Sequence, residues 1–302
     1  MIVIAGGTGR LGRLLVDRLA AGGEPVRILT RAPARAARTI RTGVEVVHGD
    51  VRDRAAVDRA VAGARVVISA MSAFGMARVS PRDVDAAGNA NLIAAAETCG
   101  VERFVLVSVL GASADHPMEL ARMKHLAEQR LMASTVPWTI LRPSTFIETF
   151  QAILCTPLLE KGKAALFGRG QNPINFVSAH DIARFAELAV SDSQLRGKVI
   201  EIGGTENLSL VRFVDIFASV LGVAGPVKHI PRLAMRLLTQ LARPFSPRFA
   251  RMAQAGLLMD TTDMSFDATQ FMQSYPQFRL TTVAEAARRD YATRVTTRTP
   301  TR

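Results

Sequence analysis

The pattern that most constrains the fold is a glycine-rich turn near the start of the chain, Gly6-Gly7-Thr8-Gly9-Arg10-Leu11-Gly12. It follows an apolar run at 1–5, which predicts a strand, and it precedes residues 10–21, where leucines recur at helical spacing. In such a turn Gly6 permits the tight bend, Gly9 lets the backbone approach a pyrophosphate, and Gly12 lets the helix pack closely on the sheet. The alternative is a glycine-rich turn that holds no ligand, and the strand–turn–helix context argues against it.

Short β-branched runs alternate with longer helical patterns along the first half of the chain, as in βαβ units with a parallel sheet. The apolar runs are continuous, as expected for strands covered on both faces. We therefore expect an α/β fold: a Rossmann doubly wound parallel sheet with a smaller C-terminal substrate lobe. The expected strands are 1–5, 26–30, 44–48, 66–70, 104–108 and 138–141, and the expected helices are 10–21, 55–61, 86–99 and 119–132.

The pattern changes after Pro143. Short apolar runs at 174–177 and 199–202 accompany helical patterns at 179–190 and 210–221. We expect an NAD(P)-binding Rossmann domain at 1–150, completed by parts of 174–205. A substrate or lid lobe is expected at 151–302, with a flexible C-terminal tail.

The chain is basic, with 38 Lys and Arg against 26 Asp and Glu, a formal charge of +12. This charge indicates an anionic partner, such as a phosphorylated cofactor, nucleic acid or a membrane surface, or else it reflects an Arg-rich proteome. Aromatic residues are few and no zinc-finger or helix-turn-helix spacing is present, so specific nucleic-acid binding is not expected.

The end of the second expected strand bears on the choice of cofactor. NAD sites usually place Asp or Glu there, but this chain has Leu29-Thr30-Arg31 and no acidic residue from Pro25 to Gly43. Arg31 can bind a 2′-phosphate, and Arg10 lies on the same side. Arg35 is interpreted as part of a solvated loop. NADP is therefore the expected cofactor, and NAD is the less favoured one.

The third expected strand ends at His48-Gly49-Asp50-Val51. A carboxylate at this edge can accept a hydrogen bond from the adenine amino group, and the backbone at Val51 would frame the ring. Without the glycine turn these residues would indicate no more than a loop.

Several segments carry a family resemblance: 6–12, 29–31, 43–50, 100–105 and 138–143, together with 176–183 and 201–204. In this order they resemble the NmrA-like NAD(P)-binding group of the atypical short-chain dehydrogenase/reductases, over about residues 1–220. That group includes reductases of quinones, isoflavonoid-type phenylpropanoids and dyes. It also includes redox-sensing regulators that bind the dinucleotide without turning it over.

The resemblance implies further contacts at matching positions. Ser69 and Ala70 would lie along the adenosine ribose and pyrophosphate, Ser108 near the nicotinamide, and Pro143 to Phe146 behind its carboxamide. The full set of expected cofactor-binding residues is Gly6, Thr8, Gly9, Arg10, Leu11, Gly12, Arg31, Asp50, Val51, Ser69, Ala70, Lys124, Pro143 and Phe146.

The expected catalytic residues are Lys124 and Ser108. Dehydrogenases of this superfamily ordinarily use Tyr-x-x-x-Lys, whose spacing puts both groups on one helical face. Here Lys124 fits the lysine position, but Leu120 occupies the tyrosine position and cannot donate a proton. Hydride transfer to an electron-poor acceptor stays open, with the proton from Lys124 or from water. Lys124 either donates this proton or only binds the ribose hydroxyls of the cofactor. Ser108 either donates a hydrogen bond to the developing oxyanion or is only a hydroxyl at the end of a strand.

The remaining features of the sequence are a helix start, the cysteines and histidines, and a basic stretch. Asp181, beside His180, is interpreted as a residue of a helix start. Cys99 and Cys155 are expected to be reduced and packed, and no histidine has metal-ligand spacing, so no metal is expected. The basic stretch 231–251 has leucines at helical spacing and is either a lid over the substrate or a helix on an anionic membrane.

No signal peptide or apolar stretch of spanning length is recognised, so the cytoplasm is the expected compartment. The expected function is an NADP(H)-dependent oxidoreductase that reduces a small apolar carbonyl or quinone-type acceptor. The alternative is a non-catalytic NADP(H)-binding redox sensor or assembly factor that acts through a protein partner. The sequence does not predict the oligomeric state.

Overall fold

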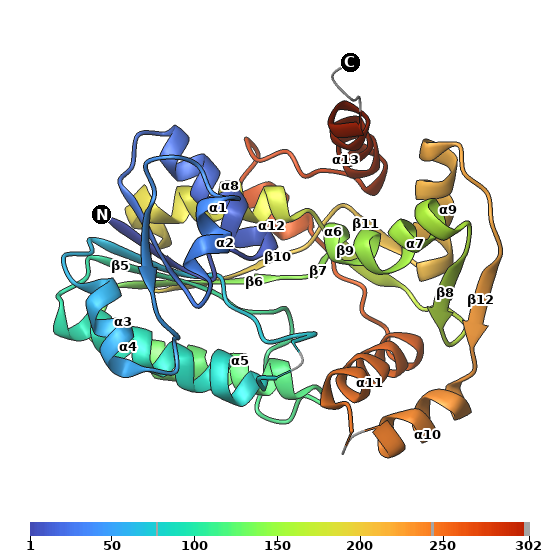
Figure 1. Ribbon diagram of the computed structural model, residues 1–302, viewed down its shortest axis with the longest axis horizontal. Helices are drawn as coiled ribbons and strands as arrows, with labels where there is room; N and C mark the ends of the chain where they lie inside the picture. The colour runs from blue at the N-terminus through green and yellow to red at the C-terminus, as the bar shows by residue number, and fades with distance from the viewer. Residues whose placement is uncertain (77, 243–244, 299–302) are drawn as a thin grey trace. The chain divides into compact units, whose positions relative to one another are not determined.

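The structure is a computed structural model that describes residues 1–76, 78–242 and 245–298 (Figure 1). The chain divides into two compact units. Unit 1 comprises 1–143 and 179–201, and unit 2 comprises 144–178 and everything from Ile202 onward.

Unit 1 is built on a seven-stranded sheet with the strand order β10-β6-β5-β4-β1-β2-β3. Neighbours from β6 through β3 pair in parallel, with Ile4 of β1 opposite both Ile28 of β2 and Ile68 of β4. The strands are β1 (Ile2–Ala5), β2 (Val26–Thr30), β3 (Glu45–His48), β4 (Val66–Ser69), β5 (Arg103–Val107), β6 (Trp138–Pro143) and β10 (Lys198–Ile202).

Helices cover both faces of this sheet. Figure 1 shows α1 (Arg10–Ala21) and α8 (Ala179–Ser191) on one face, and α3 (Arg54–Val61), α4 (Asn89–Thr98) and α5 (Glu119–Met132) on the other. The residues of β1, β4 and β5 are fully buried because both of their faces are covered. The expected doubly wound Rossmann fold is confirmed. The short α2 (Pro33–Ala37), the π-helical segment η1 (Arg82–Gly88) and the 3₁₀ turn η3 (Ser193–Leu195) complete the unit.

Unit 2 has two small sheets, with the orders β11-β9-β7 and β12-β8. Its core is an aromatic cluster in which the ring of Phe213 lies 4.6 Å from that of Phe176 and 5.0 Å from that of Phe217. Its elements are β7 (Thr145–Phe146), α6 (Ile147–Phe150), η2 (Gln151–Cys155), α7 (Thr156–Lys161), β8 (Ala164–Phe167), β9 (Ile174–Val177), β11 (Glu206–Leu208), α9 (Leu210–Leu221), β12 (Val227–Ile230), α10 (Arg232–Ala242), α11 (Pro247–Thr261), α12 (Thr269–Ser274) and α13 (Val283–Arg298).

Some local expectations differ from the structure. The helix expected at 86–99 begins earlier, because η1 adds a wider turn from Arg82 onward. Where a flexible C-terminal tail is expected, α13 is helical up to Arg298, and residues 299–302 lie outside the described residues. Both cysteines are free, but only Cys155 is packed; the expectation was wrong for Cys99, which is exposed because it follows the last turn of α4. Burial raises the pKa of Cys155 to about 12.

In the described part of the chain, no helix is both long and apolar enough to cross a bilayer. The same residues contain no cluster of three or more His, Cys, Asp or Glu side chains that could hold a metal ion.

Candidate functional site

The turn after β1 forms a cradle of backbone atoms. A Cβ at Gly12 would lie 2.1 Å from the Gly6 carbonyl oxygen, and one at Gly6 would lie 2.7 Å from the Ala70 carbonyl oxygen. Gly6 also has a φ of +86°, which disfavours other residues. A Cβ at Gly9 would meet only the Gly6 oxygen, at 3.1 Å. The space beyond Gly9 is therefore not filled by the protein, as the approach of a pyrophosphate requires.

The N-terminus of α1 opens onto the same turn. Its N-cap is Gly9, with no side chain capping it and no acidic residue in its first turn. Such a terminus offers backbone N–H groups and a partial positive charge to an anion. Arg13 donates from Nε to the Thr8 carbonyl oxygen at 3.1 Å, and the Leu11 side chain is buried. Arg10 is exposed at the helix start. These residues fit the diphosphate of a dinucleotide.

The ends of β2 and β3 bring Arg31 and Asp50 together. Arg31 Nη1 lies 4.0 Å from Asp50 Oδ2, and the Arg31 side chain is 49% exposed. Asp50 has a closer partner in Arg52, which donates from its backbone N–H and from Nε at 3.0 Å, and from Nη2 at 2.7 Å. These hydrogen bonds lower the pKa of Asp50 and keep it ionised. The sequence analysis missed Arg52, although its position two residues after an Asp is typical of an Asx turn.

Ser69 and Ala70 end β4 in different environments. The Ser69 hydroxyl is fully buried and donates to Asn89 Oδ1 at 2.6 Å, so it is engaged inside unit 1. Ala70 donates its N–H to the Ala5 carbonyl at 2.9 Å, which holds its backbone beside the glycine turn. The side chain of Val51 is partly buried, and its carbonyl accepts from Asn91 Nδ2 at 2.9 Å.

Lys124 of α5 is buried, with 2% of its side chain exposed. Its Nζ donates to the carbonyl oxygens of Met71 at 2.7 Å and Val107 at 2.9 Å, and lies 3.1 Å from Asp85 Oδ1. These two bonds use two of the three N–H groups of the ammonium, and the third lies at ion-pair distance from Asp85 without forming a hydrogen bond to its Oδ1. Lys124 therefore ties together the segments that follow β4 and β5. Leu120, one helical turn earlier, is partly buried.

Asp85, the ion-pair partner of Lys124, was not predicted from the sequence. It lies in η1, is fully buried, and accepts a hydrogen bond from the Ala73 N–H at 2.9 Å. Burial raises the pKa of Asp85, while Lys124 and the Ala73 N–H oppose that rise. Asp85 lies in a π-helical turn, and single π turns are frequent at functional sites. The residue pattern of 82–88 does not predict such a turn, so the sequence carried no signal for Asp85.

Ser108 directly follows β5, and its backbone N–H donates to the Leu141 carbonyl at 2.8 Å. Its side chain is 3% exposed, and among the described residues its Oγ has no hydrogen-bond partner. A buried hydroxyl without a partner costs free energy, so it calls for a partner from outside the chain, either an ordered water or a ligand. Ser108 adjoins Val107, whose carbonyl binds Lys124.

The last expected contacts fall on different units. Pro143 ends β6 in unit 1, where it is buried and its carbonyl accepts from the Leu110 N–H at 2.9 Å. Phe146 belongs to β7 in unit 2 and is partly buried. Asp181 lies in the first turn of α8, buried and 3.4 Å from Arg184 Nη1, as the structural interpretation of that residue predicts.

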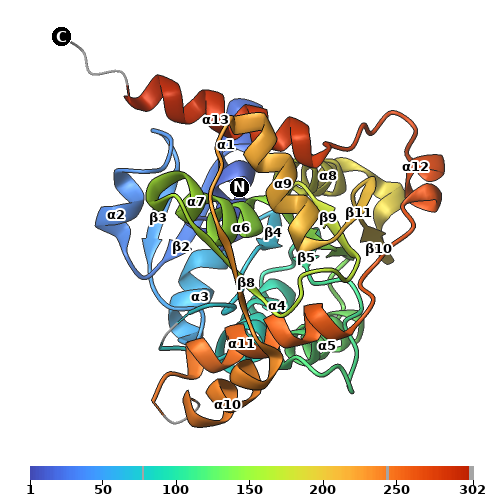
Figure 2. The same ribbon diagram turned by 90° about the vertical axis from the view of Figure 1, so that its right-hand side faces the viewer.

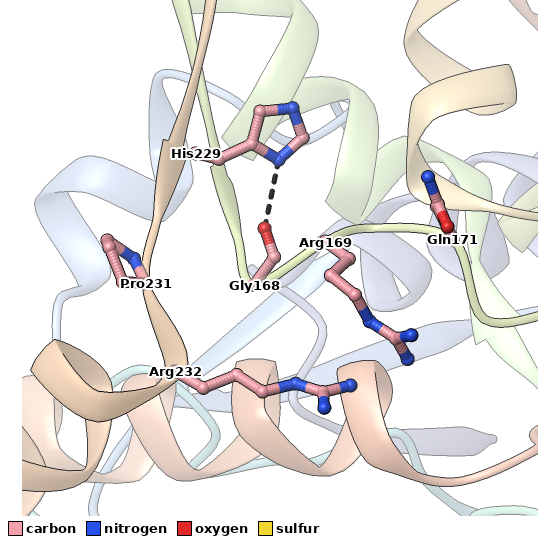
Figure 3. A pocket seen from close by; sticks show the side chains of 6 residues that line it. All are labelled: Gly168, Arg169, Gln171, His229, Pro231 and Arg232. Atoms are coloured by element: carbon pink, nitrogen blue, oxygen red, sulfur yellow. Dashed lines mark hydrogen bonds between the residues drawn. The ribbon is translucent and has the colours of Figure 1, made fainter.

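Unit 2 contains an open pocket of about 480 Å³, shown in Figure 3. It is lined by Gly168, Arg169, Gln171, His229, Pro231 and Arg232. His229 Nδ1 lies 2.9 Å from the Gly168 carbonyl oxygen. The sequence analysis did not predict this pocket, because its walls come from the segment after β8 and from the junction of β12 and α10.

Asp260 of α11 fixes one wall of this pocket. Its fully buried carboxylate accepts from the N–H groups of Arg169 at 2.8 Å and Gly170 at 3.0 Å and pairs with the Arg232 guanidinium. Burial alone would raise the pKa of Asp260, but these hydrogen bonds outweigh it and the pKa is lowered. A Cβ at Gly168 would lie 2.2 Å from the Asp260 carboxyl carbon, so only glycine fits there.

Comparison with known proteins places this geometry in a family. Residues 6–192 match the model of a family described as NAD(P)H-binding. The (4-alkanoyl-5-oxo-2,5-dihydrofuran-3-yl)methyl phosphate reductase of Streptomyces griseus is 32% identical over 224 residues, 74% of each chain. The photosystem II assembly factor Ycf39 of Synechocystis is 26% identical over 245 residues, 81% of this chain and 74% of that protein.

Solved structures show the same fold. An NADPH-dependent quinone oxidoreductase of Escherichia coli, solved with NADPH, superposes with a TM-score of 0.77 at 24% identity, covering 96% of this chain and 100% of that one. The chain therefore has the fold of the NmrA-like atypical short-chain dehydrogenase/reductases, and it belongs to the NAD(P)H-binding family of oxidoreductases.

Proposed function

We propose that the protein is an NADPH-dependent reductase of a small apolar carbonyl or quinone-type acceptor. The observation that carries the proposal is the buried Ser108 hydroxyl, which has no partner among the described residues and lies where β5 meets the carboxyl edge of the sheet. Ligands of open α/β sheets bind at this edge. The reductase of Streptomyces griseus, at 32% identity, supports the same reaction class.

The binding residues of unit 1 favour NADPH over NADH. The start of α1 binds the diphosphate, and Arg31 binds the 2′-phosphate with a charge-assisted contact. The segment after β2 supplies no carboxylate to accept from a ribose 2′-hydroxyl, since no Asp or Glu occurs from Pro25 to Gly43, and the nearby Asp50 is held by Arg52. When bound, the cofactor supplies a hydride to the acceptor.

The protein's own groups then handle the acceptor oxygen. Ser108 donates a hydrogen bond to that oxygen as negative charge develops on it, and the proton that completes the reduction comes from water. Leu120 has no proton to give, and the Lys124 ammonium is held by two backbone carbonyls and by its ion pair with Asp85. Lys124 is thus a positioning residue, which holds the Val107 carbonyl and so the adjacent Ser108. Unit 2, with its pocket, is the proposed substrate lobe.

The proposal is tested by titrating one sample with NADPH and with NADH, followed by a panel of quinones, enones and azo dyes. We expect tighter binding of NADPH and oxidation of NADPH by at least one acceptor. Tight NADPH binding without turnover across the panel would overturn the reductase assignment.

That second outcome would support the alternative, a non-catalytic NADP(H)-binding redox sensor or assembly factor. The observation that favours it is Leu120 in place of a proton-donating tyrosine, and the assembly factor of Synechocystis is a relative of this chain. The alternative predicts a protein partner that is retained with NADPH and released with NADP⁺, or the reverse.

A further inference from the structure

The surface of α10 and α11 in unit 2 exposes large apolar side chains. Leu233, Leu237 and Leu241 are 68%, 51% and 68% exposed, and Phe245 and Phe249 are 89% and 38% exposed. Of the exposed large apolar side chains in the described residues, most belong to this set. Leu233, Leu237 and Leu241 lie on α10, Phe245 lies in the turn between the helices, and Phe249 lies on α11. Large exposed apolar side chains gathered in this way mark an interaction surface rather than ordinary surface composition. We call these five residues the α10–α11 surface.

The apolar stripe is not the face that packs α10 onto the protein. Leu233, Leu237 and Leu241 are spaced by four residues, which places them on one side of the helix. Met235 is fully buried and lies about 200° around the helix from Leu233, at 100° per residue. The packing face, where α10 lies against α11 in both Figure 1 and Figure 2, is therefore opposite the leucines. Folding of unit 2 does not account for them.

The segment that forms this surface carries charge of one sign along the sequence. From Phe217 to Met259 the sequence contains no Asp or Glu, but it contains six cationic residues: Lys228, Arg232, Arg236, Arg243, Arg248 and Arg251. Arg236 and Arg248 are exposed beside the leucines and phenylalanines. The next carboxylate, Asp260, is fully buried and paired with Arg232, so it does not offset the charge of the surface.

Exposed leucines and phenylalanines edged by arginines match the interface of an anionic bilayer. The apolar side chains enter the boundary of the acyl chains, and the guanidinium groups meet the lipid phosphates. A symmetric dimer through this surface would bring two sets of these cations together, which costs free energy. We propose that the α10–α11 surface binds the protein peripherally to membranes rich in anionic lipid.

The proposal is tested by co-sedimenting the full chain with vesicles of phosphatidylcholine alone and of phosphatidylcholine with phosphatidylglycerol. We expect binding to the anionic vesicles, little to the neutral ones, and weaker binding as salt is added. Absence of binding to anionic vesicles at low salt would overturn the proposal. The readout is vesicle binding, so it does not depend on the proposed reductase activity.

Variants separate insertion from general attraction of a basic protein. Leu237→Ser with Phe245→Ser should weaken binding at least tenfold, and Arg236→Gln with Arg248→Gln should weaken it and reduce its salt dependence. Leu126→Ser is the matched control, because Leu126 is a 52% exposed leucine of α5 in unit 1. Unchanged NADPH affinity and urea unfolding show that the variants are folded.

Two results would overturn the proposal even if wild-type protein sediments with vesicles. One is wild-type affinity in the Leu237→Ser, Phe245→Ser variant, which would assign binding to overall charge. The other is a concentration-dependent dimer in sedimentation velocity that this variant abolishes, which would assign the surface to a second copy of the chain.

Discussion

The Lys124 ammonium lies 3.1 Å from the Asp85 carboxylate, and both side chains are buried in unit 1. The pair connects α5 to η1 and, through the bonds of Lys124 to Met71 and Val107, to the ends of β4 and β5. Lys124, at the lysine position of the Tyr-x-x-x-Lys spacing, is thus part of the packed structure that supports Ser108. Its role in the proposed reaction is to position, because its ammonium is held by two carbonyl oxygens and a buried carboxylate.

Replacing Lys124 with Met should destabilise the protein, since it leaves a buried carboxylate without its cation. We expect the free energy of unfolding to fall by about 3 kcal/mol near neutral pH. The native pKa of Asp85, which burial already raises, rises further in this variant. The stability that Asp85 contributes in this variant is therefore fully present below the pKa of the unfolded state, about 4. It is lost as pH rises through the pKa of the folded state.

Urea unfolding at several pH values measures this effect, and the deficit of Lys124→Met should grow with pH. The double variant Lys124→Met, Asp85→Asn is the control, because it removes both charges and should recover much of the loss. A Lys124→Met protein as stable as wild type at every pH would show that the pair is not coupled.

Ser108→Ala should lower turnover without loss of stability. The hydroxyl has no partner in the described residues, so its removal leaves no other group unpaired. We expect kcat for the acceptor to fall by about 100- to 1,000-fold, as for loss of one donor to a developing oxyanion. Steady-state kinetics measure kcat, and urea unfolding measures stability.

Ser69→Ala is the matched control. It should lower the free energy of unfolding by about 1 kcal/mol, because it deprives Asn89 of its donor. Equal kcat in Ser108→Ala and wild type would contradict the proposed role.

Arg31→Gln should weaken NADPH binding selectively. Loss of a charge-assisted contact to the 2′-phosphate should raise the Kd for NADPH about 10- to 100-fold and leave that for NADH nearly unchanged. Cofactor titrations by fluorescence or calorimetry check this. Arg35→Gln is the control, since Arg35 is an exposed residue of α2 that we do not place at the phosphate. An equal effect of both substitutions would indicate general electrostatics rather than a specific contact.

Asp260→Asn should destabilise unit 2 and disturb its pocket. The variant weakens charge-assisted bonds to Arg169, Gly170 and Arg232, and we expect a loss of about 2 kcal/mol. The native pKa of Asp260 is lowered, so its stabilisation is present above the unfolded pKa and is lost as pH falls through the native value. Thermal unfolding of wild type and variant should therefore converge in acid, and a difference that persists unchanged at low pH would contradict this account.

Local patterns in the sequence determined the main elements of unit 1. The helices at 10–21 and 119–132 have the predicted bounds, and β2 has those of the expected strand. Hydrophobic periodicity and turn preferences depend on a few consecutive residues, so they can be recognised in the sequence itself. The glycine turn could be recognised as a motif in the same way, although the structure shows that its steric requirement is only partly local: Gly12 is restricted by the Gly6 carbonyl, but Gly6 is restricted by the distant Ala70 carbonyl.

The tertiary structure alone decided which polar groups are paired and which are not. Asp85 meets Lys124, and Asp260 meets Gly170, across long stretches of chain, and nothing near either residue in the sequence indicates its partner. The isolation of the Ser108 hydroxyl is likewise a property of everything packed around it. The sequence by itself therefore determined the fold of unit 1 and its cofactor class. Folding decided the surroundings of Lys124 and Ser108, because burial and hydrogen bonding depend on contacts between distant segments.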